Sequence, residues 1–146
     1  MDTDVNGLEI LSRAEAIALL ETEEVGRLVY TRRALPAITP VNFAVRGDAV
    51  LFFTGSLSSL ITAVRGAVVG FQADHFDRAA RCGWSVSVTG KAELVCDGHE
   101  FRRAQLDGPV PWTPGPKDHL IRIPLTMVTG RRLGTHAPAP LARTAG

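Results

Sequence analysis

The longest regular hydrophobic pattern in this chain is an alternation of apolar and small polar residues across residues 84–96. Val86 and Val88 alternate with hydroxyl side chains, and a period of two places both valines on one face of a β-strand. Gly90 interrupts the alternation near its middle, as is typical of a β-bulge. We therefore predict that residues 84–96 form the longest strand of the protein, broken at Gly90.

Shorter apolar segments, separated by Gly, Pro and Asp, predict the other strands. Pro40 lies inside one of them and places it at a sheet edge or a bulge, because proline cannot donate a ladder hydrogen bond. Residues 75–82 and the proline-rich residues 108–116 are expected to be loops. We expect the strands at residues 25–31, 37–45, 49–54, 67–74, 119–123 and 126–133.

Helices are few in the predicted fold. Residues 12–15 (Ser-Arg-Ala-Glu) form a capping box, in which the Ser12 hydroxyl accepts from the Glu15 amide and the Glu15 carboxylate accepts from the Ser12 amide. Apolar residues follow at helical spacing, so we expect this helix to end near Glu23. A short helix at residues 55–64 with Gly66 as its C-terminal cap, and helical turns at residues 100–106, complete the prediction.

Short strands joined by hairpins, without repeats or strand–helix alternation, predict a mainly β fold, an antiparallel barrel or sandwich with peripheral helices. The 146 residues suit one domain, which we place at residues 1–133. Residues 134–146 are rich in Ala and Pro, and we expect them to be a disordered tail.

Composition narrows the classes of function. The formal charge of +1 creates no field that favours nucleic acid, and no apolar run approaches the roughly 20 residues that span a membrane. The N-terminus is acidic where a signal peptide is basic, so we expect a cytoplasmic protein without a nucleic-acid or membrane partner. Cys82 and Cys96 are too few for a disulfide framework, and no Cys or His cluster predicts a metal site.

The common catalytic motifs are absent from the sequence. There is no GxSxG, HExxH, P-loop or GxGxxG pattern, and the four histidines are scattered along the chain. If the protein is an enzyme, we expect a cofactor to carry the chemistry while the protein binds and orients it.

Three segments in order carry a resemblance to a known family. They are Thr39-Pro40-Val41-Asn42-Phe43, residues 83–95, and Thr129-Gly130-Arg131-Arg132-Leu133. From about Leu11 to Leu133 the chain resembles the flavin-binding split-barrel family related to pyridoxamine 5'-phosphate oxidase, and within it the small nitroimidazole-resistance-like branch. The resemblance implies an antiparallel barrel of six or seven strands that forms an obligate homodimer and binds two flavins across the interface.

The same resemblance implies a cofactor site. Thr39, Pro40, Val41 and Asn42 correspond to the strand along the edge of the isoalloxazine ring. The strand, turn and helix start that hold the flavin phosphate correspond to residues that include Phe53, Thr54, Ser58 and Ser59. Relatives commonly have a basic residue where this chain has Ser59, and Arg65 is a candidate replacement, with a solvated helix end as the alternative. FMN is therefore the expected cofactor, with a weakly held flavin, the deazaflavin F420, haem or an empty site as alternatives.

Two further residues complete the implied site. Trp112 lies in the proline-rich loop, which covers the flavin of the partner subunit in the family, and is our stacking candidate. Arg131 matches an arginine near the flavin phosphate or pyrimidine edge, with a surface ion pair as the alternative. Trp84 is expected to be a core or interface residue.

The expected function is that of a flavin-dependent oxidoreductase, in which FMN passes electrons from NAD(P)H or a similar donor to a small organic acceptor. The alternative is a homodimer that binds or senses a flavin, F420 or haem without turnover. Oxidation of pyridoxamine 5'-phosphate itself is not expected, because the Arg and His pattern that its phosphate and ring require is not evident near the C-terminus.

Overall fold

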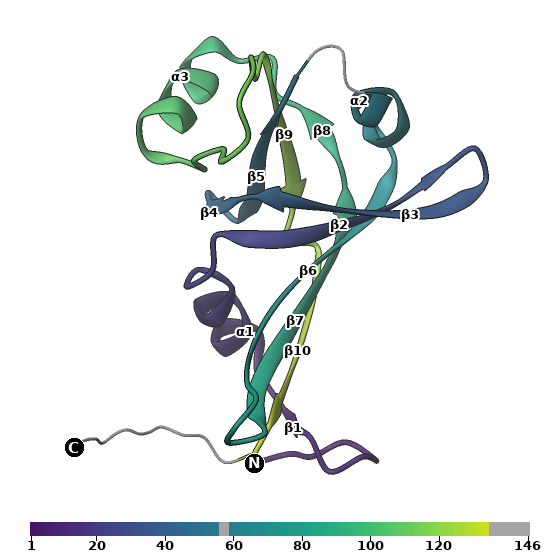
Figure 1. Cartoon of the computed structure of the whole chain (residues 1–146), viewed down its shortest axis with the longest axis vertical. Helices are drawn as coiled ribbons and strands as arrows, with labels where there is room; N and C mark the ends of the chain where they lie inside the picture. Colours follow the sequence, from purple (N-terminus) through teal and green to yellow (C-terminus); the bar gives the residue numbers. More distant parts are fainter. Residues whose placement is uncertain (56–58, 135–146) are drawn as a thin grey trace.

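The computed structural model describes residues 1–55 and 59–134, and the fold is mainly β with helices at its periphery, as predicted (Figure 1). The elements are β1 (Glu9–Ile10), α1 (Arg13–Leu20), β2 (Val25–Arg32), β3 (Leu35–Asn42), β4 (Ala44–Arg46), β5 (Ala49–Thr54), α2 (Ser59–Val64), β6 (Val68–Asp77), β7 (Cys82–Lys91), β8 (Glu93–Leu94), α3 (Gly98–Asp107), β9 (His119–Pro124) and β10 (Met127–Leu133). Residues 135–146, most of the predicted tail, lie outside the described part.

The strands form two antiparallel sheets. The six-stranded sheet has the order β1-β10-β7-β6-β2-β3, and the four-stranded sheet has the order β4-β5-β9-β8. Two predicted strands pass from one sheet to the other: residues 37–45 become β3 and β4, which meet at Phe43, and residues 84–96 become β7 and β8, which meet at Ala92. The predicted antiparallel architecture is thus confirmed. The predicted break at Gly90 lies two residues before the observed one at Ala92, and the strand predicted at residues 37–45 is divided at Phe43.

The passage of the chain between the sheets depends on Gly90. A Cβ atom at this position would lie 2.3 Å from the carbonyl oxygen of Pro124 at the end of β9. No side chain fits there, so the backbones of Gly90 and Pro124 approach each other directly. Just beyond, the Ala92 amide donates to the Ala67 carbonyl at 2.8 Å, and the Gly66 amide donates to the Ala92 carbonyl at 2.8 Å.

The main core fills the space between the sheets, with α1 closing one side. The ring of Phe71 packs edge-on against that of Phe43, with 4.8 Å between centroids, and it occupies the space that a side chain at Gly26 would need. Trp84 is buried in the same core, which confirms its predicted packing role. A smaller cluster of Leu51, Ala104 and Leu120 packs under α3 on the other face of the four-stranded sheet.

The capping box of α1 is confirmed. The Glu15 amide donates to the Ser12 hydroxyl at 3.1 Å, and the Ser12 amide donates to the Glu15 carboxylate at 2.9 Å. The helix ends at Leu20 rather than near Glu23, because the amides of Thr22 and Glu23 bond three residues back in a tighter turn.

Other boundaries differ from the prediction for local reasons. Residues 75–82 are not a loop, because β6 extends to Asp77 and β7 begins at Cys82, so the hairpin turn is short and has Arg81 at a φ of 54°. Helix α3 begins at Gly98, before the predicted residue 100, because the Asp97 carboxylate accepts from the His99 amide at 2.9 Å. Strand β1 was not predicted, since two residues carry no recognisable pattern.

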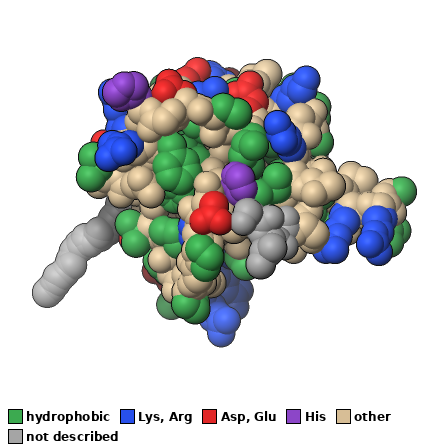
Figure 2. Space-filling view, turned by 90° about the horizontal axis from the view of Figure 1, so that it is seen from above, with side chains coloured by type: hydrophobic (Ala, Val, Ile, Leu, Met, Phe, Trp, Pro, Cys, Tyr) green, Lys and Arg blue, Asp and Glu red, His purple; other side chains and the backbone are tan. Residues whose placement is uncertain are grey.

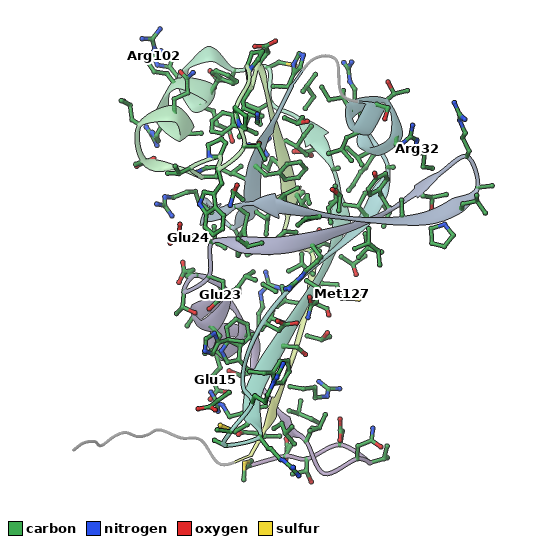
Figure 3. The ribbon with its side chains drawn as sticks, viewed as in Figure 1. Glu15, Glu23, Glu24, Arg32, Arg102 and Met127 are labelled. Carbon is green, nitrogen blue, oxygen red and sulfur yellow. The ribbon has the colours of Figure 1, made fainter. Side chains whose placement is uncertain are left out.

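The second helix begins at Ser59 within the described residues, while residues 56–58 of the predicted helix lie outside them. Gly66 follows with a φ of 75°, as expected of a helix-ending glycine. The β2–β3 hairpin projects from the body, and Figure 2 shows basic side chains at its tip, of which Arg32 is labelled in Figure 3. None of the helices described here is long and apolar enough to cross a membrane.

We predict that Gly90→Ala lowers the free energy of unfolding by roughly 3 kcal/mol, the upper end of the usual cost of overpacking, because the new methyl group meets backbone that cannot rotate away. Gly98→Ala is the matched control, since a Cβ there meets nothing within 4 Å. Urea denaturation of both variants tests this. Equal stability of the two would show that the sheets separate easily at Gly90.

Candidate functional site

The predicted ring-edge strand, β3, lies at the edge of the six-stranded sheet, as Pro40 indicated. Only β2 pairs with it in the described sheet, so the backbone groups on its other side have no neighbouring strand. Thr39 and Val41 are half-buried, and Val41 packs against the main core. Pro40 is exposed on the opposite face. Among residues 1–55 and 59–134, therefore, no second strand covers the backbone donors and acceptors on this edge of β3.

Asn42, the last residue of β3, holds the proline-rich loop. Its side-chain oxygen accepts a hydrogen bond from the backbone amide of Trp112 at 2.8 Å, across 70 residues of sequence. The Trp112 side chain is 66% exposed, so it is not a core residue. Two predicted site residues are thus brought together, although the Asn42 oxygen bonds the loop rather than being left free.

The loop is also fastened at its two ends. The Arg46 guanidinium donates to the Asp107 carbonyl at 2.6 Å, just before the loop begins. At the other end, a Cβ at Gly55 would lie 3.0 Å from the Pro116 carbonyl oxygen, so this part of the loop lies against the end of β5. Residues 108–118 contain no helix or strand, as predicted, yet contacts to β3, β4 and β5 fix their course.

The end of β5 carries two predicted residues on opposite faces. Phe53 faces α3, where its ring packs edge-on against Phe101 with 5.5 Å between centroids. Thr54 is buried and lies opposite His119 in the register of β9. Ser59 is exposed at the first position of α2, and Ser58 lies outside the described residues.

A hollow of about 470 Å³ lies between this end of β5, α3 and the loop. Lys117 is the cationic residue on its wall, and sequence reasoning missed it. A lysine in a polar loop has no pattern that distinguishes it from a solvated one. The hollow is lined by Phe53, Gln105, Pro109, Val110, Pro111, Thr113, Gly115 and Lys117. Figure 2, which looks onto the end that carries α2 and α3, shows apolar side chains gathered among charged ones on this end.

Two neighbouring hollows have different charge. One of about 400 Å³ shares Pro109 and Val110 but is also lined by Glu21, Glu23 and Glu24, two of which are labelled in Figure 3. The other, of about 300 Å³ under α3, contains Arg122.

Carboxylates already neutralise Arg122. Its guanidinium contacts Glu100 at 2.6 Å and Glu93 at 3.0 Å. Burial, the largest single effect, acts to lower the pKa of Arg122, but the hydrogen bonds and charges of Glu93 and Glu100 together raise it above its ordinary value. Arg122 is therefore an internal counter-ion rather than a free binding group.

Arg131 does not join the other candidates within one chain. It lies on β10 beside β1, at the end of the molecule away from α2 and α3 (Figure 1). Its guanidinium contacts Asp4 at 3.1 Å, which is the ion pair considered as the alternative from sequence. The pKa of Asp4 is lowered, chiefly because its carboxylate accepts a hydrogen bond from the Leu8 amide. The Arg131 guanidinium lowers it further. Arg132 points to the opposite face and pairs with Glu9 at 3.2 Å. Arg65 is exposed just after α2.

The described residues contain no group of three or more His, Cys, Asp or Glu side chains that could hold a metal ion. Cys82 and Cys96 are free thiols.

Comparison with known proteins agrees with this architecture. The family model for pyridoxamine 5'-phosphate oxidase matches residues 12–132. The protein Rv0080 of Mycobacterium tuberculosis is 39% identical over 137 residues, which cover 89% of this chain and 88% of that protein.

Comparison with solved structures also agrees with this architecture. An FAD-binding protein from Mycobacterium smegmatis is 37% identical, with a TM-score of 0.72 over 84% of this chain and 95% of its own. A Bacteroides thetaiotaomicron protein named for 5-nitroimidazole antibiotic resistance has a TM-score of 0.70 over 86% of this chain and 87% of its own. Its identity of 15% makes this a likeness of fold. With the match across residues 12–132 and the two bent strands that join its sheets, this chain belongs to the pyridoxamine 5'-phosphate oxidase family of split-barrel proteins.

Proposed function

We propose that the protein is a flavin-dependent oxidoreductase that binds its flavin along the free edge of β3, under the loop of residues 108–118. The observation that carries this proposal is the hydrogen bond from the Trp112 backbone amide to Asn42, which holds the backbone of this exposed tryptophan at the end of β3. A flavin requires hydrogen-bond partners at its pyrimidine edge and an apolar surface for its rings. The edge of β3 offers the hydrogen-bond partners, and the Trp112 indole offers the apolar surface.

The cofactor is FMN or FAD. FMN is the expectation from sequence, and FAD is supported by the M. smegmatis protein, which is 37% identical and binds FAD. The backbone of residues 39–42 would contact the pyrimidine edge, and Trp112 would stack on the ring system. The bound flavin supplies the redox step, taking electrons from NAD(P)H or a similar donor and passing them to a small organic acceptor.

A homodimer is part of the proposal. One row of residues in register crosses the outer face of the six-stranded sheet, namely Ile38, Val29, Gly70, Thr89 and Met127. Ile38 is 69% exposed and Met127, labelled in Figure 3, is 61% exposed. Small residues at the centre and apolar ones at both ends make a flat surface that a second copy can cover. A partner on this face would also reach the edge of β3, where the flavin is proposed to lie.

The absorbance spectrum of the purified protein, followed by titration with FMN and FAD, tests the cofactor. We expect flavin absorption in the blue, and a dissociation constant in the micromolar range or below for one of the two flavins. Reduction of the bound flavin by NAD(P)H and its reoxidation by an added acceptor would support the oxidoreductase. A bound flavin that undergoes neither step indicates the carrier or sensor instead, whereas an F420 or haem spectrum contradicts the choice of cofactor.

We predict that Asn42→Ala weakens flavin binding about fivefold to tenfold, because losing a hydrogen bond of about 1 kcal/mol frees the Trp112 loop. Asn42→Asp keeps an acceptor oxygen at the same place and should lie closer to the native protein. Titration followed by flavin fluorescence measures both variants. If Asn42→Ala binds flavin as well as the native chain does, the loop is not part of the site.

We predict that Ile38→Glu combined with Met127→Glu produces a folded monomer, because two buried carboxylates would face the partner across the sheet. Leu106→Glu, on the exposed side of α3, is the control and should leave the dimer intact, since Leu106 is 82% exposed and lies outside the proposed interface. Sedimentation velocity distinguishes the two. A double variant that sediments as the native protein does would place the interface elsewhere.

A further inference from the structure

Lys117 is a half-buried cation that has no carboxylate partner among the residues the structure describes. Four Lys or Arg side chains are half-buried in residues 1–55 and 59–134. Arg122, Arg131 and Arg132 each form an ion pair with Asp or Glu. Lys117 differs from these three, because its described partners are the backbone carbonyls of Pro114 at 3.1 Å and Gly115 at 3.3 Å. Its charge is therefore held in place without being neutralised.

The two carbonyl contacts leave binding capacity at the ammonium group. A lysine ammonium has three N–H donors, and two of them are used here. The side chain lies on the wall of the 470 Å³ hollow, a volume within the usual range of small-molecule sites. A third donor together with an unpaired charge suits a carboxylate or phosphate oxygen of a ligand in that hollow.

The remaining wall indicates the rest of the ligand. Phe53, Pro109, Val110 and Pro111 give one side an apolar surface, while Thr113 and Gln105 add polar groups. Of the neighbouring hollows, one is lined by three glutamates, and in the other Arg122 already pairs with Glu100 and Glu93. An apolar ring carrying an anionic group is a chemistry that these side chains accommodate.

We propose that the hollow beside Phe53 binds a ring-bearing anion whose acidic group pairs with Lys117. The inference extends the proposed flavin function, because the hollow lies under the same loop that Asn42 holds. The anion is either the phosphate of the flavin or the carboxylate of an aromatic acid that serves as the electron acceptor. Both present oxygen atoms to the same ammonium group.

Differential acetylation of lysines tests this directly, because the chain has only two lysines, Lys117 and Lys91. Lys91 is exposed at the end of β7 and serves as the internal control. The native protein is treated with an acetylating reagent alone, with FMN, with riboflavin, with benzoate, and with benzoate in the presence of flavin. Mass spectrometry then gives the rate at each lysine, and flavin fluorescence records binding in the same samples.

We expect acetylation of Lys117 to slow severalfold with a ligand while that of Lys91 stays unchanged. Protection by FMN but not by riboflavin shows that Lys117 pairs with the flavin phosphate. Additional protection by benzoate shows that Lys117 pairs with the carboxylate of a separate acid. Lys117→Gln should weaken binding of the protecting ligand about tenfold to a hundredfold, which is the effect of losing a charge-assisted hydrogen bond. Lys91→Gln should leave the affinity unchanged.

The outcomes separate this inference from the proposed function. If flavin binds but no ligand protects Lys117, the inference is overturned while the flavin function stands. If no flavin binds and benzoate alone protects Lys117, the anion site stands and the flavin function falls. Binding by Lys117→Gln at native affinity would also overturn the inference, because the charge would then have no role.

Discussion

The close approach of two backbones at Gly90 is the constraint on which the rest of this structure depends. At that point β7 passes the end of β9 with no side chain between them. The chain can then leave the six-stranded sheet at Ala92 and enter the four-stranded one. The same change of sheet at Phe43 places Asn42 at the junction between β3 and β4. Both junctions are held by backbone hydrogen bonds, including the one from the Phe43 amide to the Glu24 carbonyl at 3.0 Å.

The candidate site forms where these junctions leave strand ends and edges open. The loop of residues 108–118 has no regular hydrogen bonding of its own, yet it is fixed by contacts to Arg46, Asn42 and Gly55. The prolines of the loop also help to fix it, because they restrict its backbone and reduce the entropy lost when the loop is ordered. A preorganised loop of this kind binds a ligand at lower cost than a mobile one. The exposed indole of Trp112 and the ammonium of Lys117 are both carried by it.

Much of the fold was predictable because its signals are local. The capping box at Ser12 fixed the start of α1, the alternation around Val86 identified β7, and Pro40 placed its strand at an edge. Both strands of the β6–β7 ribbon were predicted, but its polar end within residues 75–82 was taken for a loop, because polar residues there resemble one. The change of sheet at Ala92 was missed because it depends on contacts with residues distant in sequence.

The site was less predictable, because it also depends on contacts between residues distant in sequence. Thr39, Asn42 and Trp112 were chosen from a resemblance, and the structure brings Asn42 and Trp112 together. Arg131 resembles a ligand-binding arginine in sequence, but Asp4, 127 residues away, pairs with it in the fold. Lys117 could not be identified from sequence at all, because only the absence of a described counter-ion distinguishes it from a surface lysine.

The central claim is that a flavin binds between the edge of β3 and the loop of residues 108–118. Hydrogen–deuterium exchange of the backbone amides, with and without saturating FMN or FAD, tests it most directly. The account predicts that exchange slows in peptides covering residues 35–42 and 108–118, whereas peptides covering β10 and the first ten residues change little. Slowing confined to β10 and those first residues, around Arg131, would contradict it.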